Sequence, residues 1–338
     1  MRVARLHGIR DIRLGDEPVP VPADGESLVR VTAVGLCGSD LHWFGEGGIG
    51  DAVLRRPLVI GHEFAGVVEG GPRHGQRVAV EPAIACQTCP PCRAGHRNLC
   101  PHVLFAGHGN CDGGLREYVT WPTALLHPLP DALSDAEGAL LEPLAVAVHA
   151  LDLARIPLGG SVAVVGCGPI GLMLVQAARA AGAAQVIAAD PLAHRRDAAL
   201  RLGADTAMAP VAGDLRQLGL DVAFEVAGTD AAVDAALLAV RPGARVVLMG
   251  IPDDDRTTFA ASVARRKGLT LILARRAKEV YPRAEALVRQ GRVDLASLVT
   301  SRFPLDEVDK AFTSAAGRHG LKVVVEPTRT ADRPTAGG

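Results

Sequence analysis

A glycine motif at residues 166–171 constrains the fold of this 338-residue chain more than any other feature. Residues 162–165 form the apolar run Val-Ala-Val-Val, and Gly166, Gly168 and Gly171 follow it with G-x-G-x-x-G spacing. In a strand–turn–helix unit the first glycine permits a tight turn, the second admits a pyrophosphate, and the third lets the helix pack closely on the strand. The motif therefore predicts a dinucleotide-binding unit.

The sequence around this motif alternates between apolar strands and alanine-rich helices. The predicted strands are 161–165, 185–190, 205–209, 221–226, 245–249 and 270–274. The predicted helices between them include 170–181, 193–202 and 231–240. Such alternation is typical of an α/β fold with a doubly wound parallel sheet.

The two ends of the chain have a different character. Before residue 148, short β-type runs such as 27–34, 67–69 and 77–80 are separated by Gly and Pro turns. After residue 276 we expect a helix at 281–290, a segment at 295–303 and a closing strand at 320–326. We therefore predict a first domain over 1–148, a nucleotide-binding domain over 149–276, a return to the first domain over 277–326, and a flexible tail over 327–338.

The residue that follows the second strand of the nucleotide-binding unit is an acid. Asp190 lies 19 residues after Gly171, where a carboxylate bonds the ribose hydroxyls of NAD and repels the extra phosphate of NADP. Arg195 and Arg196 leave an alternative open, because they could serve the adenine side or a 2′-phosphate; a solvated helix face explains at least Arg196. NAD is favoured, and the predicted cofactor contacts are Gly166, Gly168, Pro169, Ile170, Gly171, Asp190, Arg195, Met249, Gly250, Ile251 and Arg275.

Four of the seven cysteines fall within fifteen residues, with the spacing Cys86-x2-Cys89-x2-Cys92-x7-Cys100. Four thiolates at such spacing can close a tetrahedral zinc site with no open position, which is a structural site. An iron–sulfur run would have a shorter last gap. A nucleic-acid zinc ribbon would need a basic surface. The odd cysteine count is a poor disulfide framework and indicates a reducing compartment.

Charge and hydropathy exclude further classes of function. The formal net charge of −1 gives no global attraction to nucleic acid or to anionic lipid. Residues 156–178 hold no charged residue, but a Gly-x-Gly-Pro break at 166–169 would interrupt a membrane-spanning helix. The first residues contain no apolar run long enough for a signal peptide. We expect a cytoplasmic protein with no membrane and no nucleic-acid partner.

Chemically active side chains also occur in three separate segments. Residues 35–42 read GLCGSDLH, residues 61–63 read GHE, and residues 141–144 read LEPL. Taken singly, each has an ordinary structural explanation: Cys37 as a small buried apolar residue, His62 as a core histidine, and Glu63 and Glu142 as surface or capping carboxylates.

Together with the cysteine group and the glycine motif, these segments resemble the zinc-containing medium-chain dehydrogenases. The segments are GLCGSDLH, GHEFAG, the four-cysteine lobe at 84–101, LLEPLAVAVHA and GCGPIG. The sequence EPL, in place of a cysteine-bearing segment, resembles the sorbitol (polyol) dehydrogenase branch. The resemblance extends from residue 1 to about residue 326. It implies a GroES-like irregular β-barrel catalytic domain beside the Rossmann domain.

The resemblance implies two zinc ions per chain, one structural and one catalytic. Cys37, His62 and Glu63 would ligate the catalytic zinc, and Glu142 would bind it directly or through water. Both glutamates bound at once would leave the site net negative, so we expect one to bind at a time. Asp40 would orient His62 through its second ring nitrogen.

The resemblance also implies roles in proton transfer and substrate binding. Ser39, Glu142 and His42 are the candidates for a proton relay, and Trp43, Phe105 and Arg276 match substrate positions. Trp43 and Ala277 stand where that branch often has tyrosine, which weakens any assignment to sorbitol itself. Arg275 and Arg276 together could receive the carboxylate of a sugar acid.

The sequence thus predicts a zinc-dependent enzyme that moves hydride between NAD and a secondary alcohol of a polyol, cyclitol or sugar acid. Zinc would acidify the reacting hydroxyl, and the nicotinamide would accept hydride. Two alternatives stay open: a zinc-free quinone or enone reductase on the same fold, and a nucleotide-binding protein without catalysis. The resemblance also suggests a homotetramer or homodimer formed through edge strands of the Rossmann sheets.

Overall fold

The computed structural model describes residues 1–328, so most of the predicted flexible tail lies outside the described residues. The chain divides into two compact units. Unit 1 comprises Met1–Glu142 and the chain from Leu295 onward, and unit 2 comprises Pro143–Asp294. The sequence placed the first boundary at 148/149 and the second at 276/277. Helix α3 (Asp135–Ala154) runs across the first boundary. Helix α9 (Tyr281–Arg289) stays with unit 2, where Arg283 pairs with Asp152 at 2.7 Å.

Unit 2 contains a six-stranded sheet in which every neighbouring pair is parallel. Its order is β14-β13-β12-β15-β16-β17. The strands are β12 (Ser161–Val165), β13 (Gln185–Ala189), β14 (Thr206–Met208), β15 (Leu220–Glu225), β16 (Val240–Leu248) and β17 (Thr270–Leu273). The order reverses on either side of β12, which is the doubly wound arrangement predicted.

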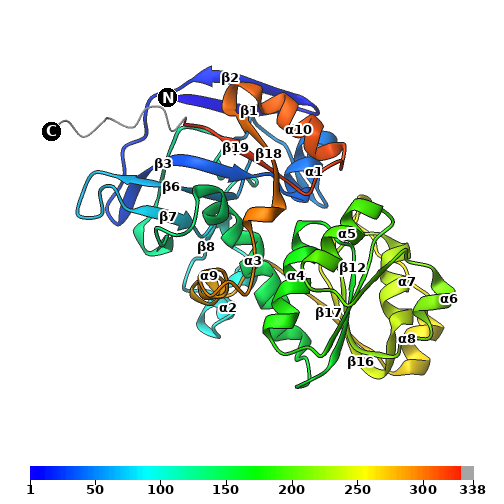
Figure 1. Ribbon diagram of the computed structural model, residues 1–338. Helices are drawn as coiled ribbons and strands as arrows, with labels where there is room; N and C mark the ends of the chain where they lie inside the picture. Colours follow the sequence, from blue (N-terminus) through cyan, green and yellow to red (C-terminus); the bar gives the residue numbers. More distant parts are fainter. Residues whose placement is uncertain (329–338) are drawn as a thin grey trace. The chain divides into compact units, whose positions relative to one another are not determined.

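Helices cover both faces of this sheet. Figure 1 shows α4 (Pro169–Ala180) and α5 (Ala193–Arg201) on one face, and α7 (Asp230–Ala239) and α8 (Ala261–Lys267) on the other. A short helix, α6 (Ala212–Leu215), precedes β15. Residues 162–165 of β12 are at most 2% exposed. A strand covered on both faces needs apolar side chains in both directions, so its sequence is a continuous apolar run.

Unit 1 is built on a seven-stranded sheet. Its order is β11-β7-β6-β3-β19-β18, and β10 also pairs with β3. The strands are β3 (Glu26–Gly35), β6 (Glu63–Glu69), β7 (Arg77–Val80), β10 (Tyr118–Pro122), β11 (Leu126–Pro128), β18 (Val299–Pro304) and β19 (Lys322–Glu326). The last described strand therefore lies next to the first long one, as Figure 1 shows, so a C-terminal segment belongs to the sheet of unit 1.

Smaller elements complete unit 1. The helices are α1 (Gly38–Glu46), α2 (Pro90–Arg93) and α10 (Val308–Ala316). The short strands are β1 (Arg2–Gly8), β2 (Asp11–Asp16), β4 (Gly48–Ile49), β5 (Ala52–Val53), β8 (Ala83–Ile84) and β9 (Leu104–Phe105). Strand β6 begins at Glu63, four residues earlier than predicted, and so places His62 and Glu63 at the point where the chain enters the sheet.

Within residues 1–328, no helix is both long and apolar enough to cross a membrane. The uncharged stretch at 156–178 is divided between β12 and α4, with the glycine turn between them.

Candidate metal centres and cofactor site

Asp40 connects two loops of unit 1 that carry candidate metal ligands. Cys37 precedes α1, and its backbone N–H donates to Asp40 Oδ2 at 2.9 Å. The backbone N–H of Gly61 donates to Asp40 Oδ1 at 3.0 Å. Gly61 has a φ of +92°, a conformation that favours glycine. Because Asp40 is fully buried, these two bonds fix the loop before α1 against the loop before β6.

These loops bring Cys37, His62 and Glu63 together. One ligand atom from each of the three lies within 4.8 Å of the other two. His62 is 5% exposed, Glu63 is completely buried, and Glu63 Oε1 has no hydrogen-bond donor. A buried carboxylate oxygen without a donor is costly unless a cation meets it. A thiol, an imidazole and a carboxylate form a donor set that zinc accepts, so the residues present fit a zinc ion.

His62 and Asp40 form a buried pair of groups with opposite charge. The ring Nδ1 of His62 lies 3.5 Å from Asp40 Oδ1. Burial opposes both charged forms, but the mutual attraction outweighs it, so the pKa of His62 is raised and that of Asp40 is lowered. The predicted role of Asp40 in orienting His62 agrees with this geometry and stays a prediction.

Glu142 lies in α3 and is 6% exposed. Burial raises the pKa of its carboxyl to about 7, and the neighbouring charge of Glu63 adds to the rise. Glu142 is not part of the compact group formed by Cys37, His62 and Glu63. Which of Glu63 and Glu142 is the direct third ligand stays a prediction.

The other predicted relay residues occupy different positions around His62. Ser39 Oγ lies 3.5 Å from His62 Nε2 and is buried. His42 Nδ1 lies 3.1 Å from Glu46 Oε1, one turn later on α1. Ser39 thus contacts the candidate metal group directly, whereas His42 pairs with an acid on its own helix.

The predicted substrate aromatics of unit 1 are linked through a histidine. Phe105 packs on His62 with ring centroids 5.3 Å apart. His108 contacts both Phe105 and Trp43, at 5.6 and 5.2 Å, with edge-on geometry. Trp43 is 1% exposed. A substrate role for Trp43 and Phe105 stays a prediction, as it does for Arg276 of unit 2.

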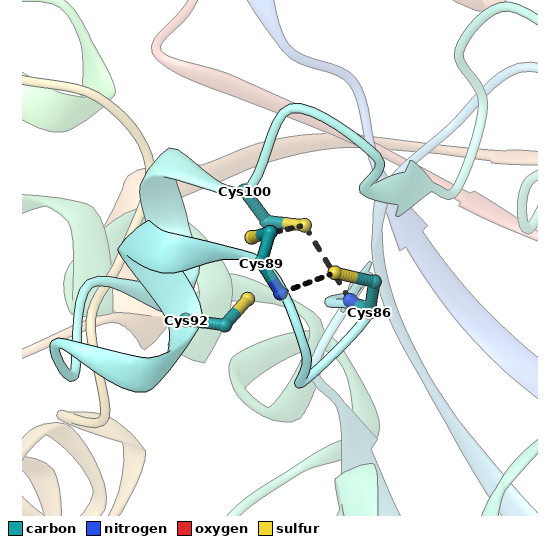
Figure 2. A group of neighbouring side chains, drawn as sticks. All are labelled: Cys86, Cys89, Cys92 and Cys100. Carbon is teal, nitrogen blue, oxygen red and sulfur yellow. Dashed lines mark hydrogen bonds between the residues drawn. The ribbon is translucent and has the colours of Figure 1, made fainter.

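The four-cysteine lobe forms a second candidate metal group. Figure 2 shows Cys86, Cys89, Cys92 and Cys100 turned toward one another, and their sulfur atoms lie within 4.8 Å of one another. The backbone N–H groups of Cys89 and Cys86 donate to Cys86 Sγ and Cys100 Sγ, each at 3.4 Å. The N–H groups of Thr88 and Cys89 lower the pKa of Cys86 to about 5, which favours a thiolate. The group fits a closed, structural zinc site.

The glycine motif of unit 2 has the geometry that dinucleotide binding needs. Gly166 has a φ of +100°, and Gly168 immediately precedes α4, whose first residue is Pro169. A Cβ at Gly171 would overlap the carbonyl oxygen of Gly166. The loop therefore depends on glycine for its turn and for close packing, and it exposes the N-terminus of α4 to a phosphate.

Asp190 follows β13 and is bonded to this loop. Its Oδ2 accepts from Cys167 N and its Oδ1 from Leu192 N, both at 2.8 Å. Arg196 Nη1 donates to the carbonyls of Asp190 and Pro191 at 2.9 and 2.8 Å. Arg196 is thus fixed on the backbone, while Arg195 lies beside Gly168.

The other predicted cofactor residues also lie in unit 2. Met249, Gly250 and Ile251 follow β16, and Met249 N donates to the carbonyl of Glu225 at 2.9 Å. Arg275 and Arg276 follow β17.

Comparison with known proteins decides the family. The description "Alcohol dehydrogenase GroES-like domain" matches residues 23–131, and "Zinc-binding dehydrogenase" matches residues 169–290. The chain is 34% identical to sorbitol dehydrogenase of Bacillus subtilis (strain 168) over 97% of this chain and 98% of that protein. The chain belongs to the zinc-containing medium-chain dehydrogenases, in their sorbitol dehydrogenase-like branch.

Two solved structures support the same conclusion. L-idonate 5-dehydrogenase from Escherichia coli matches with a TM-score of 0.90 and 27% identity, over 96% of this chain and 97% of that one. A structure from Sinorhizobium meliloti 1021, described as a zinc-binding dehydrogenase bound to NADP, matches with a TM-score of 0.88 and 32% identity, over 96% and 99%. The predicted combination of a GroES-like domain and a Rossmann domain is confirmed, and so is membership of a zinc-containing alcohol dehydrogenase family.

Two residues of this medium-chain dehydrogenase escaped the sequence analysis. Glu225 ends β15, and its Oε1 accepts from Ala227 N and Gly228 N, both at 2.7 Å. Like Asp190, it is an acid at the carboxyl end of a parallel strand. That position in the sequence could have identified Glu225 as a candidate site residue. Lys322 begins β19 and lies 2.5 Å from Glu63 Oε2. Its signal was a single charge beside the apolar run Val323–Val325.

Proposed function

We propose that this protein passes hydride between a secondary alcohol of a polyol, cyclitol or sugar acid and NAD, and that the reaction depends on zinc. The observation that carries the proposal is the buried group of Cys37, His62 and Glu63, with ligand atoms within 4.8 Å of one another. A zinc-free quinone or enone reductase would have no use for such a group, because unpaired buried polar atoms are costly.

Cys37, His62 and Glu63 would hold the catalytic zinc, and Cys86, Cys89, Cys92 and Cys100 would hold the structural one. The catalytic zinc supplies a Lewis acid that makes the reacting hydroxyl more acidic. We propose Glu142 as the group that takes up or releases the reacting proton, because its carboxyl is buried and is influenced by the charges of His62 and Glu63. Ser39, whose Oγ lies 3.5 Å from His62 Nε2, is the second candidate for this relay.

The substrate class follows from the named relatives. Sorbitol is a polyol and idonate is a sugar acid, and each offers secondary hydroxyls of the kind that the site would oxidise. Trp43 lacks the hydroxyl that a tyrosine would present, whereas Arg275 and Arg276 would suit a carboxylate. A sugar acid is therefore as good a candidate as a neutral polyol.

NAD is proposed as the cofactor because of Asp190. Its carboxylate directly follows β13, where the ribose of a bound dinucleotide would lie, and would repel a 2′-phosphate. Asp190→Asn keeps one of the two oxygens that accept from Cys167 N and Leu192 N and removes the charge, so we expect it to raise the ratio of NADP to NAD turnover about tenfold. Steady-state kinetics with both cofactors measure this ratio, and an unchanged ratio would argue against the assignment.

The proposal is tested with a panel of polyols, cyclitols, sugar acids and simple secondary alcohols, each with NAD and with NADP. Activity should disappear after thorough chelation and return when zinc is added. Metal analysis should give two zinc ions per chain. Equal activity before and after chelation would exclude the proposed reaction.

We further propose that two copies associate through β17. Strand β17 is one of the two edges of the unit 2 sheet, and Leu273 on it is 79% exposed. An open apolar edge strand is a site for pairing with a second chain. We expect Leu273→Asp to shift the mass measured by light scattering toward the monomer.

We also propose that the protein is cytoplasmic, because free cysteines fit a reducing compartment.

A further inference from the structure

A lysine at the far end of the chain contacts the candidate zinc ligand Glu63. Lys322 Nζ lies 2.5 Å from Glu63 Oε2 and donates to the carbonyl of Leu36 at 2.9 Å. Strand register produces this contact, because β19 pairs with β3, and Gly35 of β3 lies opposite Glu63 of β6. Three adjacent strands therefore bring residues 63 and 322 together.

The contact is an ion pair enclosed by protein. The side chains of Lys322 and Glu63 are 3% and 0% exposed. Burial lowers the pKa of a lysine, but the Glu63 carboxylate outweighs that effect and raises the pKa of Lys322. At 2.5 Å the two side chains form a buried ion pair, and a buried charge of this kind is tolerated only with its partner in place.

The pair leaves the two oxygens of Glu63 in different situations. Oε2 lies 2.5 Å from the ammonium, and neither carboxylate oxygen has a hydrogen-bond partner beyond that ion pair. Gly35 makes the arrangement possible, because a Cβ there would overlap Glu63 Oε2 and lie 3.0 Å from Lys322 Cε. Glu63 thus has one occupied oxygen and one that is free to bind a cation.

We infer that Lys322 is a positioning residue that holds Glu63 Oε2, so that Glu63 binds the catalytic metal through Oε1 alone. This inference rests on the proposed zinc site. It also changes the charge count made from the sequence, which omitted this ammonium. The charged or titratable groups around the metal are Cys37, Asp40, His62, Glu63, Glu142 and Lys322. With one glutamate charge offset by Lys322, Glu142 can remain near the metal as a carboxylate that does not bind it.

The experiment uses the full chain loaded with cobalt(II), whose visible absorption reports coordination number. The contribution of the four-cysteine lobe, recorded in Cys37→Ser, is subtracted so that the bands report the catalytic site, and wild type should then show intense bands of a four-coordinate site. Lys322→Met removes the ammonium, so Glu63 can bind through both oxygens, and these bands should lose at least about half of their intensity. Lys322→Arg keeps the charge and should keep the wild-type spectrum. An unchanged spectrum in Lys322→Met, or a five-coordinate spectrum in wild type, overturns the inference.

Lys267→Met is the matched control. Lys267 Nζ donates to the carbonyls of Leu237, Leu238 and Val240 at 2.6 to 2.9 Å, all within unit 2. This variant should lose stability while its cobalt spectrum stays unchanged. If Lys322→Met does not fold, Gly35→Ala displaces Glu63 Oε2 with Lys322 still present, and the difference between the wild-type and Cys37→Ser spectra still decides the coordination number of the catalytic site.

A further variant separates the inference from the function on which it rests. Cys37→Ser should remove the sulfur-to-cobalt charge-transfer band of the catalytic site and leave the contribution of the four-cysteine lobe. If Cys37→Ser leaves the whole spectrum unchanged, the zinc site itself is wrong. If Cys37→Ser changes the spectrum and Lys322→Met does not, only the role of Lys322 is wrong.

Discussion

The two candidate metal groups of unit 1 are assembled in opposite ways. The four-cysteine lobe takes all its ligands from residues 86–100, so chain spacing alone brings the sulfurs together. The group of Cys37, His62 and Glu63 takes its ligands from two loops, is tied by Asp40, and is supported by a lysine near the C-terminus. The lobe is thus a local structure that a metal can stabilise, whereas the second group depends on the complete sheet.

The largest effect that tests this contrast is on activity. Cys37→Ser should lower kcat/KM by at least about 1000-fold, because the catalytic metal loses its thiolate. The sheet does not depend on that sulfur, so the thermal midpoint should change little. Cys111→Ser, a cysteine of unit 1 outside both groups, should keep nearly full activity. If Cys37→Ser and Cys111→Ser lost kcat/KM to a comparable extent, the proposed catalytic metal group would be wrong.

Replacing a cysteine of the four-cysteine lobe should instead lower the stability of the protein. Cys92→Ser removes one of four closed ligands and should lower the free energy of unfolding by at least about 3 kcal/mol, because structural zinc contributes directly to folding. Denaturant unfolding and metal analysis measure this, with one zinc expected instead of two. NAD binding in unit 2 should persist. A stable, fully active Cys92→Ser protein would argue that the lobe holds no structural metal.

The buried carboxyl of Glu142 should make the unfolding free energy of the apoprotein depend on pH. The pKa of Glu142 is raised by burial from its ordinary 4.5 to about 7. Between these values the folded apoprotein binds a proton that the unfolded chain has lost. Unfolding free energy therefore falls as pH rises through this window, by up to about 3 kcal/mol.

Glu142→Gln should remove this dependence, and the difference between the two apoproteins isolates Glu142 from other titrating groups. Denaturant unfolding at intervals from pH 4.5 to 8 provides the measurement. Parallel curves for the two proteins would show that Glu142 titrates normally.

The smallest expected effect concerns the connection between the two loops. Asp40→Asn keeps the size of the side chain but removes the charge facing His62, and should weaken zinc binding at the catalytic site by about 10- to 100-fold. Competition with a chromophoric chelator measures the affinity. Asp24→Asn, on an exposed turn of unit 1, serves as the control, and zinc in the lobe should be retained in both. Equal affinities would show that Asp40 only supports the fold.

The nucleotide-binding sheet was predictable because its signals are local. Five of its six strands begin within one residue of the predicted positions, since buried parallel strands are short apolar runs between glycines. Strand β16 was predicted to begin at 245, but it begins at Val240, because α7 continues directly into it. The domain boundaries were harder to predict from the sequence, because α3 runs without interruption from one unit into the other.

The sequence by itself determined the glycine turn at Gly166, the cysteine spacing of the lobe and the order of strands and helices, because each depends on residues close together in the chain. Tertiary structure alone decided that Lys322 meets Glu63 and that Asp40 joins the loops of Cys37 and Gly61. Those contacts depend on how β19, β3 and β6 align across a sheet. No spacing along the chain encodes that register.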